Sequence, residues 1–375
     1  MAAGRIIAGV MTGTSGDGVD VALARIAPDW SWRLLGWQHA GFAPRERRAI
    51  LAVAGGAAGP AELARLHFGL GRRIGAAVRA ACQTAGVAPG RLALVASHGQ
   101  TVFHQGRVAS LQIGAPAAIA AAAGAAVVSD FRAADIAQGG EGAPLVPWAD
   151  WRLFQHPARY RVALNLGGIA NLTLLPPGGS ADEVIGFDTG PGNMACDALM
   201  QELSGGRRSF DRGGALGLRG QVQAGLLRGW LRHPFFRRPP PKSAGREQFG
   251  AAYVRELRRR ARGAAAADLM ATLAALTAAT VALGVRRGGR QALGAEVIAA
   301  GGGVRNRAIM AALARALPRC RWRTSDEVGV PAQAREALAF ALLGEAYLRG
   351  EPANLPRVTG AARAVVLGSY TPAPR

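Results

Sequence analysis

Three glycine-rich turns, each joined to apolar β-forming residues, constrain this chain more than any other feature. They occupy residues 11–18, 165–173 and 301–306. The first two are predicted to be β-hairpin tips that offer backbone N–H groups to an anion such as phosphate. Glycines in the third allow the backbone to approach a flat ligand such as adenosine closely. Each turn alone would be an ordinary polar turn, but several in one chain favour a site for an anionic ligand.

A fourth glycine-rich stretch, residues 184–193, brings an acid to the end of a strand. Val184 to Phe187 is predicted to end a buried strand, and Asp188 follows at once, before a turn with two glycines, a proline and an asparagine. A carboxylate beside exposed backbone N–H groups can act as a general base next to a bound anion. The alternative is an aspartate that closes an ordinary turn.

The first hairpin is predicted to pair strands at 5–10 and 19–26. Its tip carries several hydroxyl side chains, and Asp17 and Asp20 add carboxylates that can hold a hydrated Mg²⁺ near phosphates. The tip has neither the lysine-containing pattern of a P-loop nor the spaced glycines of a dinucleotide fold.

Polar residues also follow a predicted strand at 92–96. Ser97, His98 and Gln100 come directly after it, at the strand end where α/β proteins commonly place ligand contacts. For His98 a buried structural role is an equal alternative. No acidic partner lies at metal-ligand spacing, so a metal site on this histidine is not expected.

Arg132 follows the next predicted strand, at 125–128. Its guanidinium matches a carboxylate in a bidentate geometry, which makes it a candidate ligand for an acidic substrate. The alternative is an ion pair with Asp130 or Asp135.

Two single residues stand out further along the chain. Lys242, the only lysine, lies in a proline-rich loop at 239–246. It either supplies a compact charge for phosphate or is a lysine retained by chance. Glu336 lies in a predicted helix at 331–348, and a carboxylate beside a buried face is either paired or functional. Other helices are expected at about 44–85, 147–156, 196–203, 268–285 and 307–317, and the buried strand before the third turn at 296–300.

Composition limits the class of protein. The chain has 375 residues, 50% of them hydrophobic, which suits two domains. Its net charge of +21 is typical of nucleic-acid binders. However, the arginines are spread along the chain, and aromatic residues do not alternate with them as a single-strand platform requires. A bias toward Arg, Ala and Gly laid over an enzyme explains the charge better, so no nucleic-acid partner is expected.

Cysteine usage and hydropathy favour a cytoplasmic protein. The three cysteines form no closely spaced pair, which argues against a disulfide framework or a zinc site. The longest apolar run, 115–128, is interrupted and too short to span a membrane. No signal-peptide pattern precedes the first strand. We therefore expect no membrane partner.

A series of motifs, in chain order, resembles the anhydro-N-acetylmuramic acid kinase family of the actin, sugar-kinase and heat-shock-chaperone superfamily. The motifs run nearly from end to end, at residues 13–20, 97–101, 130–132, 142–147, 165–171, 186–193, 240–243 and 354–361. Small departures exist: Thr12 stands where the family usually has Ser, Gly16 where a larger apolar residue is usual, and Gln333 where an acid is expected. None removes a group with a catalytic role, although Gly16 would loosen the first hairpin.

The resemblance implies an α/β fold of two domains, the actin-like ATPase (ribonuclease H-like) fold, with ATP and sugar in the interdomain cleft. Domain I would comprise residues 1–158 and 335–375, and domain II residues 159–334. Each domain would rest on a mixed five-stranded sheet, and a homodimer is implied.

The resemblance also assigns roles to residues. ATP would be bound by Gly13, Thr14, Ser15, Gly16, Asp17, Gly18, Val19, Asp20, Asn165, Gly167, Gly168, Gly301, Gly302, Gly303 and Asn306. Mg²⁺ would be reached through water from Asp17 and Asp20. The sugar would be bound by Ser97, His98, Gln100, Arg132, Asp188, Gly190 and Glu336.

The family's reaction opens the 1,6-anhydro bridge of 1,6-anhydro-N-acetylmuramate with water and transfers phosphate from ATP to O6, giving N-acetylmuramate 6-phosphate and ADP in peptidoglycan recycling. By this resemblance Asp188 would take the proton of the attacking water. Arg132 and Glu336 would position the sugar. Two alternatives stay open: an ordinary amino-sugar or hexose kinase on the same clamp, and a non-enzymatic nucleotide-gated or nucleic-acid binder.

Overall fold

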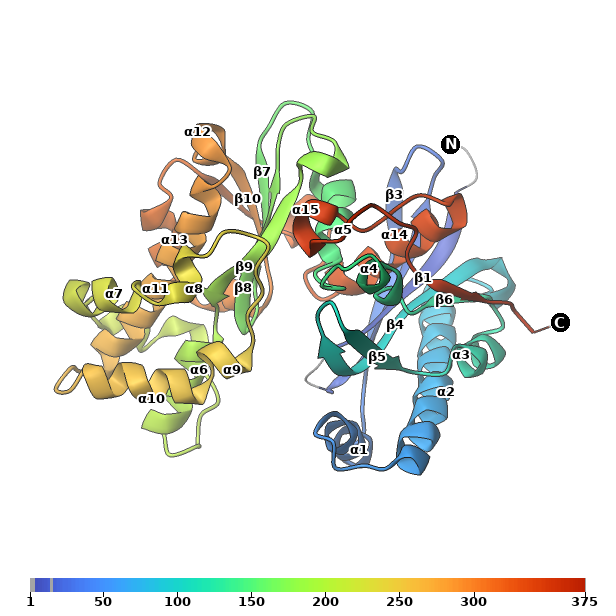
Figure 1. Cartoon of the computed structure of the whole chain (residues 1–375), viewed down its shortest axis with the longest axis horizontal. Coiled ribbons are helices and arrows are strands. Elements are labelled where there is room, and N and C mark those ends of the chain that lie inside the picture. Colours follow the sequence, from blue (N-terminus) through green and yellow to red (C-terminus); the bar gives the residue numbers. More distant parts are fainter. Residues whose placement is uncertain (1–3, 14–15, 375) are drawn as a thin grey trace. The chain divides into compact units, whose positions relative to one another are not determined.

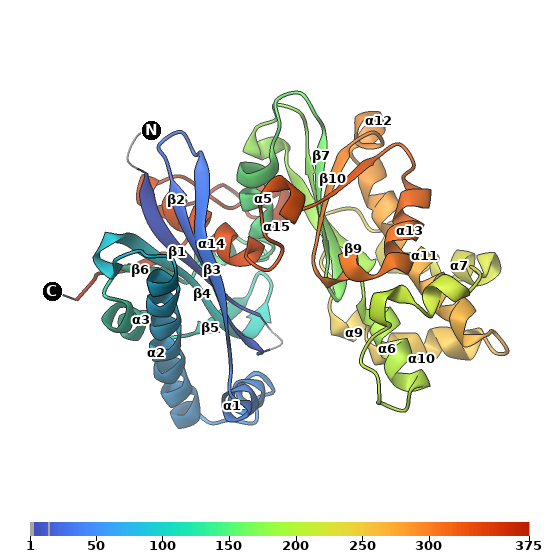
Figure 2. The same ribbon diagram turned by 180° about the vertical axis from the view of Figure 1, so that it is seen from behind.

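The computed structural model describes residues 4–13 and 16–374. The chain divides into two compact units. Unit 1 comprises Met1–Leu153 and Gln333–Arg375, and unit 2 comprises Phe154–Ala332 (Figures 1 and 2).

Unit 1 is built on a mixed sheet of seven strands in the order β12–β6–β4–β1–β2–β3, with β5 paired to β4. The resemblance implied a five-stranded sheet core, whereas this sheet has two strands more. The two extra strands arise because β5 folds back antiparallel on the long β4 and because β12 pairs antiparallel with β6. The strands are β1 (Arg5–Thr12), β2 (Gly18–Ile26), β3 (Trp32–Gly41), β4 (Leu92–Gln105), β5 (Ala109–Ile113), β6 (Val127–Ser129) and β12 (Ser369–Thr371).

Helices cover both faces of the unit 1 sheet. Ala8 and Val10 of β1 pack with Ile74 of α2 in one buried cluster. Gly9 faces α14 instead, where a Cβ would lie 1.9 Å from the carbonyl oxygen of Ala337. Alternate residues of β1 therefore meet different helices, which explains why its sequence is apolar without alternation.

The unit 1 helices differ from expectation at two places. The region 44–85 holds two helices, because glycines at 55, 56 and 59 interrupt it and Pro60 begins the second. The helix expected from 331 begins at Arg335. The helices are α1 (Pro44–Ala54), α2 (Pro60–Thr84), α3 (Pro116–Ala123), α4 (Ala133–Ala137), α5 (Val146–Phe154), α14 (Arg335–Arg349) and α15 (Pro356–Thr359).

Unit 2 is built on a mixed sheet of five strands in the order β11–β10–β7–β8–β9, as expected. Strands β7, β10 and β11 are parallel, whereas β7–β8 and β8–β9 are antiparallel. The strands are β7 (Arg161–Leu166), β8 (Ile169–Leu175), β9 (Ile185–Pro191), β10 (Glu296–Ala300) and β11 (Arg321–Thr324).

The helix α11 (Ala266–Arg286) forms the centre of the unit 2 core. It is long and apolar enough to cross a membrane, yet 78% of its most apolar window is buried within the protein. Gly284 allows its close approach to the sheet, since a Cβ there would lie 2.7 Å from Leu172 of β8. The remaining helices are α6 (Met194–Leu203), α7 (Ala224–Trp230), α8 (Pro234–Arg237), α9 (Arg246–Phe249), α10 (Ala251–Arg260), α12 (Gly289–Ala292) and α13 (Arg307–Ala316).

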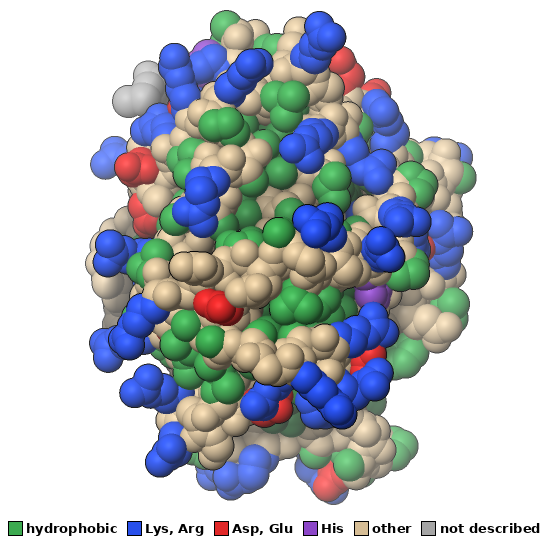
Figure 3. Space-filling model, turned by 90° about the vertical axis from the view of Figure 1, so that its left-hand side faces the viewer, with side chains coloured by type: hydrophobic (Ala, Val, Ile, Leu, Met, Phe, Trp, Pro, Cys, Tyr) green, Lys and Arg blue, Asp and Glu red, His purple; other side chains and the backbone are tan. Residues whose placement is uncertain are grey.

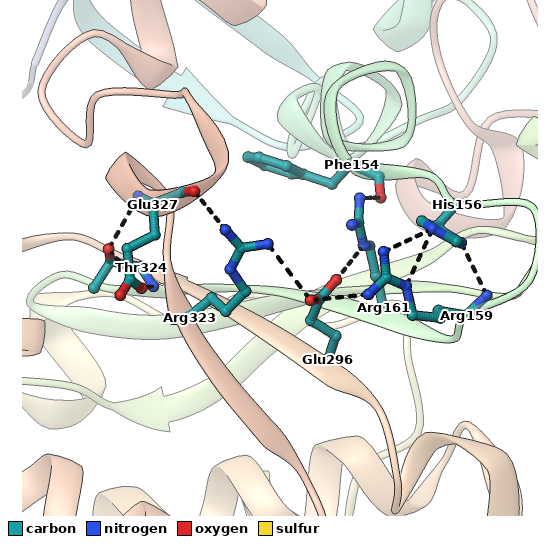
Figure 4. A network of polar contacts seen from close by, with 8 residues as sticks. All are labelled: Phe154, His156, Arg159, Arg161, Glu296, Arg323, Thr324 and Glu327. Carbon is teal, nitrogen blue, oxygen red and sulfur yellow. Dashed lines mark hydrogen bonds and ion pairs between the residues drawn. The ribbon is translucent and has the colours of Figure 1, made fainter.

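One buried carboxylate ties together the amino-terminal ends of the parallel strands in unit 2 (Figure 4). Glu296, at the start of β10, accepts a 2.7 Å hydrogen bond from Arg161 of β7. Arg159 and Arg323 approach the same carboxylate at 3.6 and 3.7 Å. Arg161 also donates to the carbonyl of Phe154, so the network fixes the segment with which unit 2 begins.

Arginines are dispersed over one face of the protein (Figure 3). Figure 3 shows them scattered among apolar and uncharged side chains on the side that carries α7, α10 and α13, with few acids between them. This face has no single basic groove of the kind that would follow a nucleic-acid backbone.

Candidate active site

Asp188 lies within β9 and not after it. The prediction that the strand ends at Phe187 is wrong, because β8 pairs with β9 as far as Pro191, opposite Ile169. The carboxylate is held by the loop that follows α8: its Oδ2 accepts a 2.8 Å hydrogen bond from the backbone N–H of Ala244. The backbone N–H of Asp188 donates to the carbonyl of Lys242. Strand and loop thus hold the acid in one position.

The surroundings of Asp188 suit a base that works near neutral pH. Burial raises the pKa of Asp188 to about 6, while the Ala244 hydrogen bond and the charge of Lys242 act in the opposite direction. A carboxyl group with this pKa is mostly ionised at pH 7 and accepts a proton more readily than an ordinary aspartate.

Lys242 holds the loop against the core. Its buried Nζ donates a 3.1 Å hydrogen bond to the carbonyl of Phe235 and lies 4.5 Å from the centroid of that ring. Burial, with Arg287 and Arg238 nearby, lowers the pKa of Lys242 to about 8. The ammonium is therefore a buried cation next to Asp188.

The glycine-rich turns of unit 2 come together, as their predicted common role requires. The N–H groups of Gly192 and Asn193 donate 2.8 Å hydrogen bonds to the carbonyls of Gly168 and Gly167 in the β7–β8 turn. Gly301, with φ +86°, packs so closely that a Cβ would lie 2.7 Å from Oδ1 of Asn165. Only glycine fits this junction.

A pocket of about 260 Å³ adjoins this junction and includes two of the residues predicted to bind nucleotide, Gly302 and Asn306. Asn306 also begins α13, where its Oδ1 accepts the N–H groups of Ala308 and Ile309. Gly302 and Asn306 of the third turn thus line a cavity of a size suited to a small ligand.

The same pocket holds two acids that the sequence analysis missed, Asp197 of α6 and Asp211. Burial and the charge of Asp211 raise the pKa of Asp197 to about 6. The sequence signal that could have pointed to Asp211 is the pair of glycines at 213 and 214. Both adopt positive φ in the structure.

In unit 1, β4 is tied to the tip of the first hairpin. Oγ1 of Thr12 donates to the carbonyl of Gly99, and Nε2 of Gln100 donates to the carbonyl of Gly13. The expectation that Ser97 to Thr101 follow a strand is wrong, because β4 continues to Gln105, paired with β5. Side chains that face one way from a strand are held more rigidly than side chains of a loop.

The structure describes most of the residues of this hairpin that are predicted to bind phosphate. Thr14 and Ser15 lie outside the described residues. Gly16 has φ +60°, and the nearest atom to a Cβ there would be 3.5 Å away, so conformation and not space explains the glycine. Gly18, which precedes Val19, has no space for a side chain, since a Cβ there would lie 2.6 Å from the ring of His39.

The two acids predicted to reach Mg²⁺ lie close enough for their charges to interact. Asp20 contacts Nδ1 of His39 at 2.8 Å, and burial raises its pKa above the ordinary value. Asp17 is exposed. Among the described residues no group of three or more His, Cys, Asp or Glu could enclose a metal ion. Two carboxylates suit an ion that keeps its water and binds phosphate.

Arg132 forms neither of the ion pairs considered as alternatives. Its Nε and Nη2 contact Nε2 of His98 at 3.2 and 2.9 Å, and its Nη1 donates to the carbonyl of Gly142. Nδ1 of His98 contacts the carbonyl of Gly99, which places the ring proton there and leaves Nε2 to accept. Burial, then the charge of Arg132, lowers the pKa of His98 to about 3, so the ring is neutral.

Glu336 lies in the first turn of α14 and is exposed at the surface of unit 1. The protein around its carboxyl still desolvates it and raises its pKa, against the charges of Arg335 and Arg132. Arg335 is engaged elsewhere, in a buried bidentate pair with Asp150. Glu336 therefore combines solvent access with a perturbed pKa, as a ligand-binding acid requires.

Two of the residues predicted to bind the sugar have a buried polar atom with no hydrogen-bond partner among the described residues: Oγ of Ser97 and Oε1 of Gln100. Unsatisfied buried atoms are rare in folded proteins and point to a ligand or ordered water. Gly190, also predicted for the sugar, is buried in β9, where a Cβ would lie 2.7 Å from the ring of Phe236.

Comparison with known proteins decides the family. The sequence pattern of the family described as anhydro-N-acetylmuramic acid kinase matches residues 5–373. The chain belongs to this family. Two curated relatives named anhydro-N-acetylmuramic acid kinase are from Acidithiobacillus ferrooxidans (44% identical, covering 97% of this chain and 91% of the relative) and Parasynechococcus marenigrum (42%, covering 96% and 97%).

Among solved structures, this kinase is similar to component A of the Acidaminococcus fermentans (R)-2-hydroxyglutaryl-CoA dehydratase, with a TM-score of 0.45 and 13% identity over 90% of this chain and 96% of that one. A ROK family glucokinase from Streptomyces griseus gives a TM-score of 0.38 at 12% identity, over 90% and 97%. The predicted α/β class with two domains is confirmed, since each of the two compact units has helices packed on a mixed sheet. The family match makes this chain a kinase.

Proposed function

We propose that this kinase opens the 1,6-anhydro ring of 1,6-anhydro-N-acetylmuramate with water and phosphorylates O6 from ATP. The products are N-acetylmuramate 6-phosphate and ADP, within peptidoglycan recycling. The observation that carries the proposal is Asp188, a carboxylate with a pKa of about 6 held by the Ala244 N–H in a glycine-rich sheet edge.

Asp188 acts on water and not on a sugar hydroxyl, since O6 is bonded to C1 in the anhydro-sugar. The water oxygen attacks C1, its proton passes to Asp188, and the C1–O6 bond breaks. O6, now carrying negative charge, attacks the γ-phosphorus of ATP, and ADP leaves. The charge of Lys242 near Asp188 keeps the carboxylate ionised until the water is bound.

The remaining predicted residues bind and orient the substrates. Backbone N–H groups of the glycine-rich turns offset the phosphate charge, at residues 13–20, 167–168 and 301–303. In unit 1, Arg132 and Glu336 bind the lactyl carboxylate and a hydroxyl of the sugar, and the unpartnered atoms of Ser97 and Gln100 are further candidates for its polar groups. Arg132 has one further N–H each on Nη1 and Nη2 for this purpose, because its contacts with His98 and Gly142 use three of its five N–H groups.

Asp17 and Asp20 would hold Mg²⁺ through water. Both are carboxylates with hard oxygen ligands, and their small number matches an ion that is coordinated mainly by phosphate and water. When bound, the ion offsets charge on the β- and γ-phosphates.

We also place the enzyme in the cytoplasm as a homodimer. Its three cysteines are free and buried, which suits a reducing compartment. Sedimentation velocity tests the dimer: a species of about twice the 38.7 kDa chain mass is expected, and a single species at the chain mass contradicts it.

Product analysis tests the reaction directly. The protein is incubated with ATP in H₂¹⁸O and given anhydro-N-acetylmuramate, N-acetylmuramate or N-acetylglucosamine. A product that gains both water and phosphoryl, with the label on the anomeric carbon, supports the proposal. Phosphorylation of only the two sugars that carry a free O6 hydroxyl would instead identify an ordinary amino-sugar kinase.

A further inference from the structure

Asp135 of α4 is a fully buried acid of unit 1. Its Oδ2 accepts a 2.8 Å hydrogen bond from the backbone N–H of Gly142. Its Oδ1 accepts two hydrogen bonds of 2.7 Å, from Nδ2 of Asn354 and from Oγ1 of Thr359. Three donors therefore converge on a carboxylate, a group that only accepts, and they satisfy both of its oxygens.

The motif at 354–361 near the end of the chain supplies two of these donors, through the side chains of Asn354 and Thr359. The carbonyl of Thr359 also accepts the backbone N–H of Glu141 at 2.7 Å. This backbone bond holds the motif against the loop that follows α4. Asp135 joins the same two segments through its side chain, so its carboxylate fixes the position of the loop.

Gly142 connects Asp135 to the proposed sugar site. Its N–H donates to Asp135, and its carbonyl accepts a 2.7 Å hydrogen bond from Nη1 of Arg132. Only glycine fits at this position, since φ is +68° and a Cβ would lie 2.7 Å from Cγ1 of Ile136. The Nε and Nη2 edge of the guanidinium contacts His98. Gly142 and His98 together therefore hold the guanidinium on two of its edges.

The charge of Asp135 also acts on Arg132, although the two side chains form no ion pair. Burial lowers the pKa of Arg132 to about 10, and the charges of Glu336 and Asp135 act in the opposite direction. Two parallel N–H groups bind a carboxylate well only in one orientation, so a small rotation of the guanidinium weakens the interaction. The position of Gly142 therefore matters for binding an acidic ligand.

We propose that Asp135 is a positioning residue for recognition of an acidic sugar: through Gly142 it holds Arg132 in the orientation that binds the lactyl carboxylate. The motif at 354–361 holds Asp135 in turn, which gives this motif a part in substrate binding. The inference rests on the proposed function, since it requires that Arg132 binds the sugar.

Steady-state kinetics of Asp135→Asn test the proposal. An amide has one acceptor oxygen where the protein places donors at both oxygens, so at least one bond is lost. We expect KM for anhydro-N-acetylmuramate to rise about three- to tenfold and KM for ATP to stay within about twofold. Combined with Arg132→Lys, the change should raise the sugar KM by less than about twofold more, because both substitutions remove the same interaction.

Glu345→Gln is the matched control. Glu345 is also a buried acid of unit 1, but its carboxylate accepts from Arg5 and Arg349, away from Arg132. This variant should leave both KM values unchanged even if it lowers the melting temperature. It separates loss of a buried acid in general from loss of Asp135.

Nitrogen NMR of the His98 ring gives a readout without substrate. Nε2 of His98 accepts from Arg132, and its resonance is assigned as one of those lost in His98→Gln. In Asp135→Asn this resonance should move toward the position of an imidazole nitrogen that accepts no hydrogen bond. Thr359→Val removes only one of the three donors, so it should cause a smaller shift in the same direction, with a sugar KM raised about threefold.

An unchanged sugar KM and an unchanged His98 resonance in folded Asp135→Asn would overturn the proposal. Equal increases in both KM values, or fully additive effects of Asp135→Asn and Arg132→Lys, would also overturn it. Should Asp135→Asn not fold, Thr359→Val decides by the same two measurements. An unchanged sugar KM in Arg132→Lys alone would instead refute the role of Arg132 in the proposed function, so the two failures are distinguishable.

Discussion

The backbone N–H of Ala244 lies 2.8 Å from Oδ2 of Asp188 and donates to it, which joins the carboxylate of β9 to the loop that carries the only lysine. Lys242 fixes the other end of this connection by donating to the carbonyl of Phe235. The loop therefore sets both the position of the proposed base and part of its electrostatic environment. Several measurable consequences depend on this arrangement.

The activity should depend on pH through Asp188. Because burial raises the pKa of this carboxyl to about 6, the group is protonated and inactive as a base below that pH. We expect kcat/KM to fall about tenfold per pH unit below about pH 6 and to be level just above it. A steady-state profile from pH 4.5 to 8 measures this. An acid limb near pH 4, where an ordinary aspartate titrates, would contradict the assignment.

Removal of the lysine charge should move that acid limb. Lys242→Met keeps much of the side-chain volume but loses the bond to Phe235 and the cation that favours ionised Asp188. We expect the acid limb of the Lys242→Met profile at higher pH than in the wild type, with kcat lowered about tenfold. A purely structural lysine would lower kcat without moving the limb. Arg238→Gln, at a more exposed neighbouring cation, is the control.

Arg132 should determine the affinity for the acidic sugar. Lysine cannot offer two parallel N–H groups, so Arg132→Lys should raise KM for anhydro-N-acetylmuramate by about tenfold or more, with little change in KM for ATP. Initial rates with each substrate varied in turn measure both constants. An unchanged sugar KM would remove Arg132 from the sugar site and leave its contacts with His98 and Gly142 as a structural role.

The Glu296 network should contribute to stability and not to activity (Figure 4). Burial alone would raise the pKa of Glu296. The Arg161 hydrogen bond and the three arginine charges outweigh burial, so the pKa of Glu296 is lowered. Glu296→Gln leaves these arginines without their acid, so urea unfolding should show a loss of about 3 kcal/mol at pH 7. The loss should shrink as the pH falls and wild-type Glu296 becomes protonated. Arg159→Gln, at an exposed member, should cost less than about 1 kcal/mol. Equal losses for both variants would contradict this account.

Local patterns were enough to predict much of the fold. The sequence predicted β10 at 296–300, as observed, because a short buried run between glycines leaves no other choice. It also predicted the β7–β8 hairpin, whose turn consists of two adjacent glycines. The ends of β4 and β9 were wrong because pairing with β5 and with β8 extends them, and such pairing is decided by tertiary contacts.

The site could be predicted only in part, for a similar reason. Asp188 and the glycine-rich turns carry strong local signals, and the structure brings the unit 2 turns together. The contact between Arg132 and His98 joins residues that are 34 positions apart. An arginine and a histidine do not attract each other as opposite charges do, so the sequence gives no signal for this pair. Asp197 has no distinctive neighbours along the chain, and its pKa is perturbed only in the folded protein, by burial and then by the charge of Asp211.

The most direct test of the account is the single-turnover and steady-state activity of Asp188→Asn, with ATP and sugar affinities measured alongside by calorimetry. Asparagine keeps the volume of the side chain and can accept the Ala244 hydrogen bond, but it cannot take a proton. We predict that both ligands bind within a few-fold of wild type, that kcat falls by about 10²- to 10⁴-fold, and that higher pH does not restore it. A variant that keeps at least about a tenth of wild-type kcat would contradict the role of Asp188 as the base.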